Sequence, residues 1–507
     1  MKNSTNKHYN AGPESWKGLR GSFVTVFVMA LILTVFLITL LSLYPDMPVL
    51  TRLAENFEGL NAIYPPFRGD ENVYYEIAEN LLNGNLYEKG SPERSYSVGY
   101  SILAAPFIAV LGKIGGYIAN VFIVWGCLIV LYLIVRRYGS RVKALVLTII
   151  MAFATLNWFY AVSYYTEPLS QLLLILGFYL LTVNRDSPRW GIAVTLAGVV
   201  TALNLFVRPH YILIAVPFFL YLWIDIQKKF VFDKRAFLFA GGAAIVVVLF
   251  LMRNLFVFGG PFTFEYTRHI TDYVPGAPSM YMKGNIFLGT HRLLFDQYHG
   301  LFTITPIFLI FPAGLRSMWL KGMKKESFLL LASVVIMALF AAASTYPFTE
   351  FGLGSRHLVP ILPLMLFPAV FFVDGKLFSS SLITILALYS FYHAGFGWFT
   401  GGEPGMGFFL GILNDSQSRA IILARKDLLP KKEFDSEEDL INTYLKALEK
   451  ANMMKFLQTI DPYVIDRIEG NERTFMLHLR NQRDPKSFIL KADPERGIIF
   501  KSFTISD

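Results

Sequence analysis

The sequence predicts an α-helical polytopic membrane protein of about eleven transmembrane helices with a small soluble α+β domain at its carboxyl end. Three observations lead to this class. The 507-residue chain is 54% hydrophobic and only 16% charged, whereas a soluble domain is typically about a quarter charged. Its apolar residues gather in runs of about 20, the length that crosses a bilayer as a helix. From about residue 399 onward such runs are missing and acidic and basic residues nearly balance.

The net charge of +9 does not point to a nucleic acid partner. Lysines and arginines lie in short clusters between the apolar runs, so membrane topology explains them better than a polyanion does. The single cysteine, Cys127, lies inside an apolar run. A disulfide framework and a cysteine metal site are therefore excluded.

The first apolar run, residues 22–44, predicts a retained membrane anchor that follows a cytoplasmic segment, residues 1–21. It is longer than a signal-peptide core of roughly 7–15 residues and has no clear small-residue cleavage site. Ten further spans are expected before residue 398, at 117–135, 144–162, 168–183, 190–207, 209–226, 236–257, 300–319, 327–345, 358–373 and 377–398.

Residues 97–112 are apolar but short, with Pro106 inside, and they decide the topology. Counting them as a span would give twelve spans and move every later loop to the other side of the membrane. With eleven spans, fifteen lysines and arginines after the first span face the cytoplasm and six face outward beyond the first loop. The positive-inside rule therefore favours eleven, with 97–112 as a half-buried or re-entrant helix in the outer loop 45–116.

The carboxyl-terminal segment, residues 399–507, is then expected outside the cytoplasm as a small soluble domain. A helix is predicted from Ser436, where a hydroxyl cap and acidic residues precede a helical pattern. Three strands are predicted at 474–480, 487–493 and 497–505.

With eleven spans, the unusual polar residues at span ends all fall on the outer side. Ionisable groups at membrane depth are costly and usually line a cavity or pair with one another. Acids, arginines and histidines together suit a site that binds an anion and removes a proton. These residues are Asp70 and Glu71, Glu167, Arg208 and His210, Arg253, Asp296 and His299, and Arg356 and His357.

Several of these residues taken alone also have a purely structural explanation. Asp70 can cap a helix over 71–83. Glu167 precedes Pro168, a favoured first helical residue, so its charge can serve the helix dipole. Arg208 and Arg253 can be snorkelling anchors at span ends. For Arg356 and His357 a functional role is favoured, because nearby glycines allow close approach of a ligand and a guanidinium fork matches phosphate oxygens.

The chain resembles a known family in an ordered set of segments over residues 20–400. They are "RGDENVYYEIAENLLNGNLY", "SYSVGYSILAAPFIAVLG", "YTEPL", "RNLFVFGGPF", "GLFTITPIFLIFPAGL" and "GSRHLVPILPLM". These are similar to elements of the polytopic GT-C glycosyltransferases, in the bacterial branch of protein mannosyltransferases and the lipid A aminoarabinose transferase. The carboxyl-terminal segment lies outside the resemblance.

The resemblance implies an inverting hexosyl- or pentosyltransferase that takes a sugar from a polyprenyl-phosphate donor. Asp70 matches the first-loop acid and would be the general base, supported by Glu71 and Glu167. Arg356, His357, Arg253 and Arg208 would bind the donor phosphate. The remaining expected pocket residues are Asp296, His299 and Tyr74. No cofactor is required on this hypothesis, and a metal site is not predicted, although Glu71 could help bind a divalent ion.

The expected partners are the polyprenyl-linked sugar, membrane lipids, and a lipid, glycan or protein acceptor, and no nucleic acid. The expected location is the inner membrane of a prokaryote, with the active site outside the cytoplasm, as in lipopolysaccharide or protein glycosylation. Three alternatives stay open: a lipid-linked sugar transporter or flippase, an oligosaccharide ligase with a diphosphate-linked donor, and a non-catalytic scaffold. Transporters usually place polar groups near mid-membrane on broken helices, a pattern that this sequence does not show.

Overall fold

The computed structural model describes the main helical elements of the chain and four strands near its end. The described residues are 17–42, 70–85, 87, 96–182, 189–223, 234–263, 285–295, 300–343, 355–373, 377–396, 463–471, 474–481, 487–493 and 497–502. Internal contacts divide the chain into two units, Met1–Phe396 and Gly397–Asp507.

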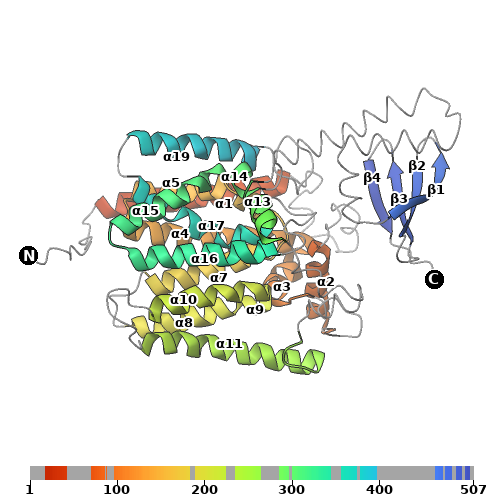
Figure 1. Cartoon of the computed structure of the whole chain (residues 1–507), viewed down its shortest axis with the longest axis horizontal. Coiled ribbons are helices and arrows are strands. Elements are labelled where there is room, and N and C mark those ends of the chain that lie inside the picture. The colour runs from red at the N-terminus through yellow and green to blue at the C-terminus, as the bar shows by residue number, and fades with distance from the viewer. Residues whose placement is uncertain are drawn as a thin grey trace, which may run out of the picture. The chain divides into compact units, whose positions relative to one another are not determined.

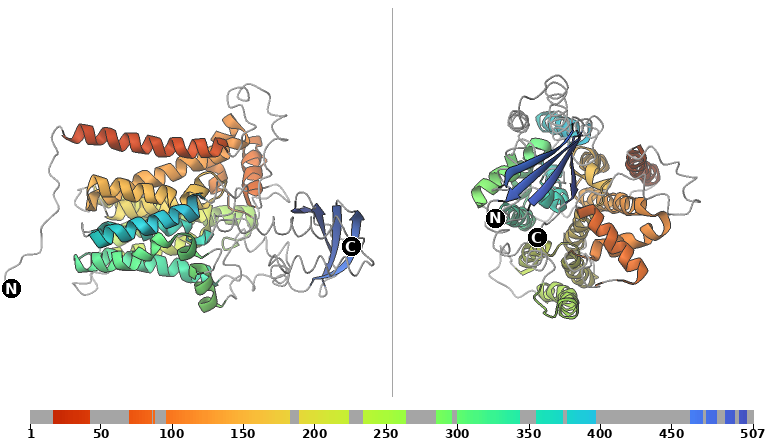
Figure 2. Two further views of the ribbon diagram at one scale, coloured as in Figure 1. Left: turned by 90° about the horizontal axis from the view of Figure 1, so that it is seen from above. Right: turned by 90° about the vertical axis from the view of Figure 1, so that its right-hand side faces the viewer.

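The long helices of the first unit lie side by side (Figures 1 and 2). They are α1 (Lys17–Ser42), α4 (Lys113–Tyr138), α7 (Glu167–Thr182), α8 (Trp190–Ala202), α11 (Lys234–Phe258), α16 (Lys324–Ala343) and α19 (Leu377–Ser390). At one end of this bundle, α2 (Asp70–Asn83) runs across the direction of the long helices (Figure 1). The shorter elements are α3 (Gly99–Leu111), α5 (Arg141–Phe153), α6 (Asn157–Ala161), α9 (Asn204–Val207), η3 (Pro209–Ile214), α10 (Ala215–Trp223), α13 (Ile286–Phe295), α14 (Leu301–Ile304), η5 (Pro306–Ile310), α15 (Phe311–Leu320), η6 (Arg356–Ile361), α17 (Leu362–Leu366), α18 (Ala369–Phe372) and η7 (Phe391–Phe396).

Five helical segments among the described residues are long and apolar enough to cross a membrane. They are Ser22–Leu41, Lys113–Tyr138, Trp190–Val207, Lys234–Phe258 and Lys324–Ala343. Many large apolar side chains on these helices are exposed, as expected of surfaces that face lipid. A helical membrane protein is thus supported, while the count of eleven spans stays a prediction.

Two of the predicted spans are divided into consecutive helical elements. Residues 300–319 form α14, η5 and α15, and residues 358–373 form η6, α17 and α18. Proline interrupts the regular α-helix at each place, because it has no N–H to donate and clashes with the preceding turn. Pro306 begins η5, and Pro360 and Pro363 lie where η6 gives way to α17.

The ambiguous segment 97–112 contains a separate short helix, α3. Its 13 residues rise about 20 Å, less than the roughly 30 Å of a hydrocarbon core. Gly112, with a φ of 63°, turns the chain from α3 into α4. α3 packs against both α2 and α4. The expected short helix is thus present, while its place in an outer loop stays a prediction.

Polar bonds join α1 to the rest of the bundle. The Tyr132 hydroxyl lies 3.0 Å from Thr25 Oγ1, and the Trp125 indole donates to the carbonyl of Met29 over 2.9 Å. Trp158 donates to Thr39 Oγ1 over 3.2 Å. α1 is therefore packed as part of the fold.

Two glycines let α8 and α11 approach each other closely. A Cβ atom on Gly198 would lie 2.0 Å from the carbonyl oxygen of Phe239, and one on Gly242 would lie 2.1 Å from that of Thr195. Small residues at such an interface allow backbones to pack directly in a membrane.

The second unit contains a four-stranded antiparallel sheet in the order β1-β2-β3-β4. The strands are β1 (Tyr463–Asn471), β2 (Thr474–Asn481), β3 (Ser487–Asp493) and β4 (Gly497–Ser502). The three predicted strands correspond to β2, β3 and β4. β1 was not predicted, because Asp466, Arg467 and Glu469 interrupt its apolar alternation. The helix predicted from Ser436 lies outside the described residues.

Candidate active site

The acidic stretch of the first loop begins helix α2. Asp70 is its first residue, and its side chain lies outside the described part of the structure. Tyr74, Ile77 and Ala78 are buried, as the helical pattern predicts. Gly84 follows the helix with a φ of 75°, the left-handed conformation that ends many helices.

Glu71 is buried and accepts a hydrogen bond from a distant backbone amide. Its Oε1 lies 2.7 Å from the N atom of Tyr164, and the residue is 7% exposed. Tyr164 belongs to residues 162–166, which connect α6 to α7 and are called the α6–α7 loop here. The bond therefore joins the first turn of α2 to the residues immediately before Glu167.

Helix α4 holds the same loop. Asn120 Nδ2 donates to the carbonyls of Ser163 and Tyr165 over 2.7 and 2.9 Å. Gly116 lies against the ring of Tyr164, so closely that a Cβ atom would be 2.3 Å from Cε2. Burial raises the pKa of the Tyr164 phenol well above its ordinary value, so its hydroxyl stays protonated and donates to the Tyr74 carbonyl over 3.4 Å.

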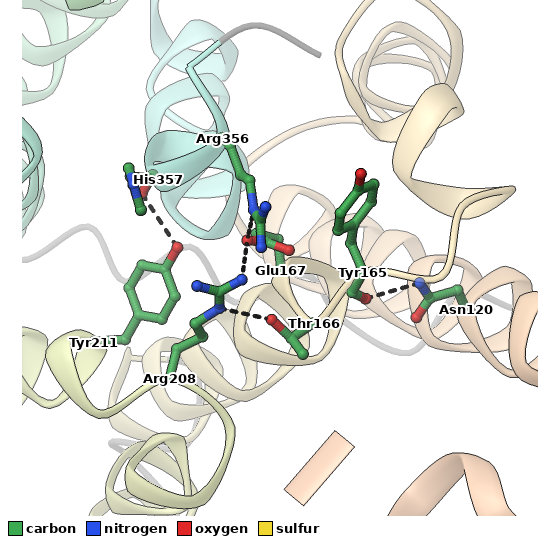
Figure 3. Close-up of polar contacts among 8 residues, drawn as sticks. All are labelled: Asn120, Tyr165, Thr166, Glu167, Arg208, Tyr211, Arg356 and His357. Carbon is green, nitrogen blue, oxygen red and sulfur yellow. Dashed lines mark hydrogen bonds and ion pairs between the residues drawn. The ribbon is translucent and has the colours of Figure 1, made fainter. Parts of the chain in front are cut away.

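Glu167, the first residue of α7, is fully buried between two arginines (Figure 3). Arg356, the first residue of η6, donates through Nε to its Oε1. Arg208, between α9 and η3, places Nη2 3.2 Å from the same oxygen. Arg208 also donates through Nε to Thr166 Oγ1 over 2.9 Å. These three charged residues are called the arginine–glutamate cluster below.

The charges of this cluster do not cancel within it. Arg208 and Arg356 are 5% and 2% exposed, and Glu167 is 0% exposed. A buried charge is costly unless it is paired and hydrogen-bonded, so the carboxylate stabilises both guanidinium groups in place. Two cations on one anion leave these three residues with a net positive charge.

Further bonds fix η6 beside this cluster. Gln171, one turn beyond Glu167 on α7, donates through Nε2 to the carbonyl of Val359 over 2.8 Å. Ser355 donates through its hydroxyl to the carbonyl of Leu293 over 2.6 Å. The cation of Arg356 also lies 4.7 Å from the centre of the Tyr165 ring, a cation–π distance.

His357 and His210 lie beside the arginines that precede them in sequence. Their rings are 5.6 Å apart between centroids. His210 stacks on Phe340 of α16 at 4.8 Å. Tyr211 donates to the carbonyl of His357 over 3.4 Å. η3 and η6 therefore meet at these two histidines.

The structure thus brings Glu167, Arg208 and Arg356 into contact and links Glu71 to them through the α6–α7 loop. Arg253 instead donates to the hydroxyl of Tyr87 over 3.2 Å, just beyond the end of α2.

Tyr74 is buried in an aromatic group, with its ring 5.9 Å from those of Tyr96 and Tyr100. Asp296 and His299 lie outside the described residues. Within the described residues, no three histidine, cysteine, aspartate or glutamate side chains come together as metal ligands.

Sequence reasoning missed Thr166, Asn120 and Gln171, which hold the arginine–glutamate cluster and its loop. Asn120 and Gln171 are fully buried within otherwise apolar helices. A buried amide side chain needs hydrogen-bond partners. An asparagine or glutamine inside an apolar run therefore indicates a polar contact with another segment.

Comparisons with known proteins give a distant structural likeness. No family model matches the chain, and no curated protein matches its sequence. Among solved structures, two of the Archaeoglobus fulgidus oligosaccharyltransferase are similar, one in complex with zinc and sulfate and one tethered to an acceptor peptide. Both have a TM-score of 0.40, with 13% and 10% sequence identity. The alignments cover 82% of this chain and 57% and 59% of the archaeal chains, so this chain spans less than two thirds of their length.

Proposed function

We propose that the chain is a GT-C glycosyltransferase that moves a sugar from a polyprenyl-phosphate donor to a lipid, glycan or protein acceptor on the outer face of the membrane. The observation that carries this proposal is the burial of Glu167 between Arg208 and Arg356. The cluster is linked through the α6–α7 loop to the start of α2, where Asp70 lies. A cationic group and a candidate base are thereby held by one connected set of contacts.

The cationic cluster suits the leaving group of such a reaction. When the bond between the anomeric carbon and the phosphate oxygen breaks, the polyprenyl phosphate takes the electron pair and gains negative charge. Fixed guanidinium groups stabilise the negative charge that develops on the phosphate, so the leaving oxygen does not need to be protonated. A guanidinium has five N–H donors in a planar fork and can bind a carboxylate and a phosphate together. His357, beside Arg356, would help to position the donor.

Asp70 would act on the other substrate. The acceptor hydroxyl attacks the anomeric carbon, forms the new glycosidic bond and gives its proton to the Asp70 carboxylate. The displacement happens once, so the configuration at the anomeric carbon inverts and no second carboxylate is needed as a nucleophile.

The apolar helices suit a polyprenyl substrate, because its hydrocarbon tail is too insoluble to arrive through water. Apolar packing along the tail would supply affinity without selecting the sugar. Arg253, near the end of α2, would contact the donor or acceptor farther from the arginine–glutamate cluster.

Mass spectrometry of surface glycolipids and glycoproteins, with and without the gene, tests the proposal. We expect the deletion to remove one sugar from one class of surface molecule and to increase the amount of the matching polyprenyl-phosphate sugar. Restoring the wild-type gene should reverse both changes. Unchanged surface molecules in the deletion strain would overturn the proposal.

Two further measurements separate the alternatives. Purified protein in detergent should still transfer the sugar, although detergent micelles have no two compartments; a flippase would show no transfer there. The mass added to the acceptor should be that of a single sugar, whereas an oligosaccharide ligase would add a larger unit.

A further inference from the structure

The α6–α7 loop contacts α2, α4 and Arg208 of the candidate site. Its Tyr164 amide bonds to Glu71 of α2, and its Ser163 and Tyr165 carbonyls bond to Asn120 of α4. Its last residue, Thr166, accepts a hydrogen bond from Arg208. The next residue in the chain is Glu167, which pairs with both arginines.

The hydrogen bond that Glu71 accepts from the Tyr164 amide joins the first turn of α2 to the loop. Tyr164 also donates to the Tyr74 carbonyl, one turn farther along α2, over a longer distance of 3.4 Å. A carboxylate that accepts a backbone N–H at 2.7 Å makes a short, charge-assisted hydrogen bond. The bond is buried, so water competes with it little.

We infer that Glu71 is a positioning residue that sets the place of α2, and with it Asp70, relative to the arginine–glutamate cluster. This inference rests on the proposed function. It assigns to Glu71 a task that needs a hydrogen-bond acceptor at the end of the side chain. A second acid or a ligand for a divalent ion would need the negative charge itself.

The geometry supports the positioning role over those two. Glu71 and Asp70 are consecutive in α2, so their side chains leave the helix about 100° apart. The carboxylate of Glu71 is turned to the Tyr164 amide and is buried. Its neighbour Glu76 is exposed on the same helix and has the same side chain, so it provides a matched control.

Replacement of Glu71 by glutamine and by leucine tests the inference. Glu71→Gln keeps an acceptor oxygen and removes the charge, whereas Glu71→Leu removes both at similar size. The two variants and Glu76→Gln are expressed as the full chain in the deletion strain, and the surface product is measured per amount of folded protein. We expect Glu71→Gln to retain product within about threefold and Glu71→Leu to lose about tenfold or more, as loss of a charge-assisted hydrogen bond predicts. Glu76→Gln should match the wild type.

Hydrogen–deuterium exchange of the purified chain gives a readout that does not depend on catalysis. In Glu71→Leu, exchange of the peptide that contains Tyr164 should rise about tenfold or more, because its amide loses its acceptor. In Glu71→Gln it should rise far less, and in Glu76→Gln it should not change. Unchanged exchange in Glu71→Leu would overturn the inference, even if no transfer reaction is found.

The glutamine variant decides the matter if the leucine variant does not fold. A Glu71→Gln protein that is folded, protected at Tyr164 and active supports positioning. One that is folded and protected but inactive would show that the charge itself is required, and the inference would be wrong.

Discussion

Arg356 and Glu167, which are 189 residues apart in the chain, form an ion pair that is buried on both sides. Arg208 contacts the same carboxylate oxygen from a third segment. Three segments that carry the predicted outer-face charges are thus joined at one atom. The contribution of each partner can be separated by substitution.

Replacement of Glu167 by glutamine should destabilise the fold strongly. It leaves two buried guanidinium groups without their shared anion, and removing one partner of a buried pair costs about 3–5 kcal/mol. Chemical unfolding of the purified protein in detergent measures this loss. Glu76→Gln, an exposed change of the same type, should leave the free energy of unfolding within about 0.5 kcal/mol. Equal stability of the two variants would show that Glu167 does not hold the arginines in place.

Replacement of Arg356 by alanine should weaken binding of the donor lipid. We expect undecaprenyl phosphate to bind about 10–100-fold more weakly, since a hydrogen bond to a charged group contributes about 1.5–3 kcal/mol. Arg235→Ala is the control, because Arg235 lies at the start of α11 and stacks on Trp190 at 4.0 Å. Binding of undecaprenol, which has no phosphate, should not change in Arg356→Ala. The same loss for both lipids would argue against a phosphate contact.

Replacement of Asp70 by asparagine should abolish most sugar transfer without unfolding the protein. Loss of a general base typically lowers the rate by about 10²–10⁴-fold. Transfer in detergent is the direct measurement, with unfolding and undecaprenyl phosphate binding as tests of integrity. Near-normal turnover would remove Asp70 from the role of base and leave it as the start of α2.

Adjacent glycines of α11 should respond in opposite ways to alanine. Gly242→Ala forces a methyl group to within 2.1 Å of the Thr195 carbonyl oxygen, and such overpacking costs about 1–3 kcal/mol. A Cβ on Gly241 meets no atom within 4 Å, so Gly241→Ala should stabilise the helix by about 0.5–1 kcal/mol. Thermal unfolding of both variants gives the comparison. A Gly242→Ala protein as stable as the wild type would show that α8 and α11 can separate without cost.

Local sequence signals predicted the elements that depend on local chemistry. The pattern of Tyr74, Ile77 and Ala78 gave the buried face of α2, and Gly84 gave its end. The prolines in 300–319 and 358–373 were visible, yet hydropathy alone treated each segment as one helix. Pro360 and Pro363 lie where η6 gives way to α17, and Pro368 precedes α18. A hydropathy count ignores these prolines.

The pairing of the charged residues could not be predicted in the same way. The sequence predicted Glu167, Arg208 and Arg356 on one side of the membrane, but the choice of partners depends on how α7, η3 and η6 pack. Arg253 was grouped with the other arginines and contacts Tyr87 instead. The sequence showed that Arg253 carries a charge. It did not show that the residues after α2 would bring Tyr87 into contact with it.

The attachment of α1 to α4 bears on how the amino-terminal part can be altered. The indole of Trp125 donates to the Met29 carbonyl, and the Tyr132 hydroxyl meets Thr25. Another apolar helix of equal length would keep a backbone carbonyl at the position of Met29 but would lack the hydroxyl of Thr25 that meets Tyr132. A helix that only anchors a protein in the membrane can be exchanged for another apolar helix. In this chain α1 also forms hydrogen bonds with side chains of α4, so it is part of the packed bundle.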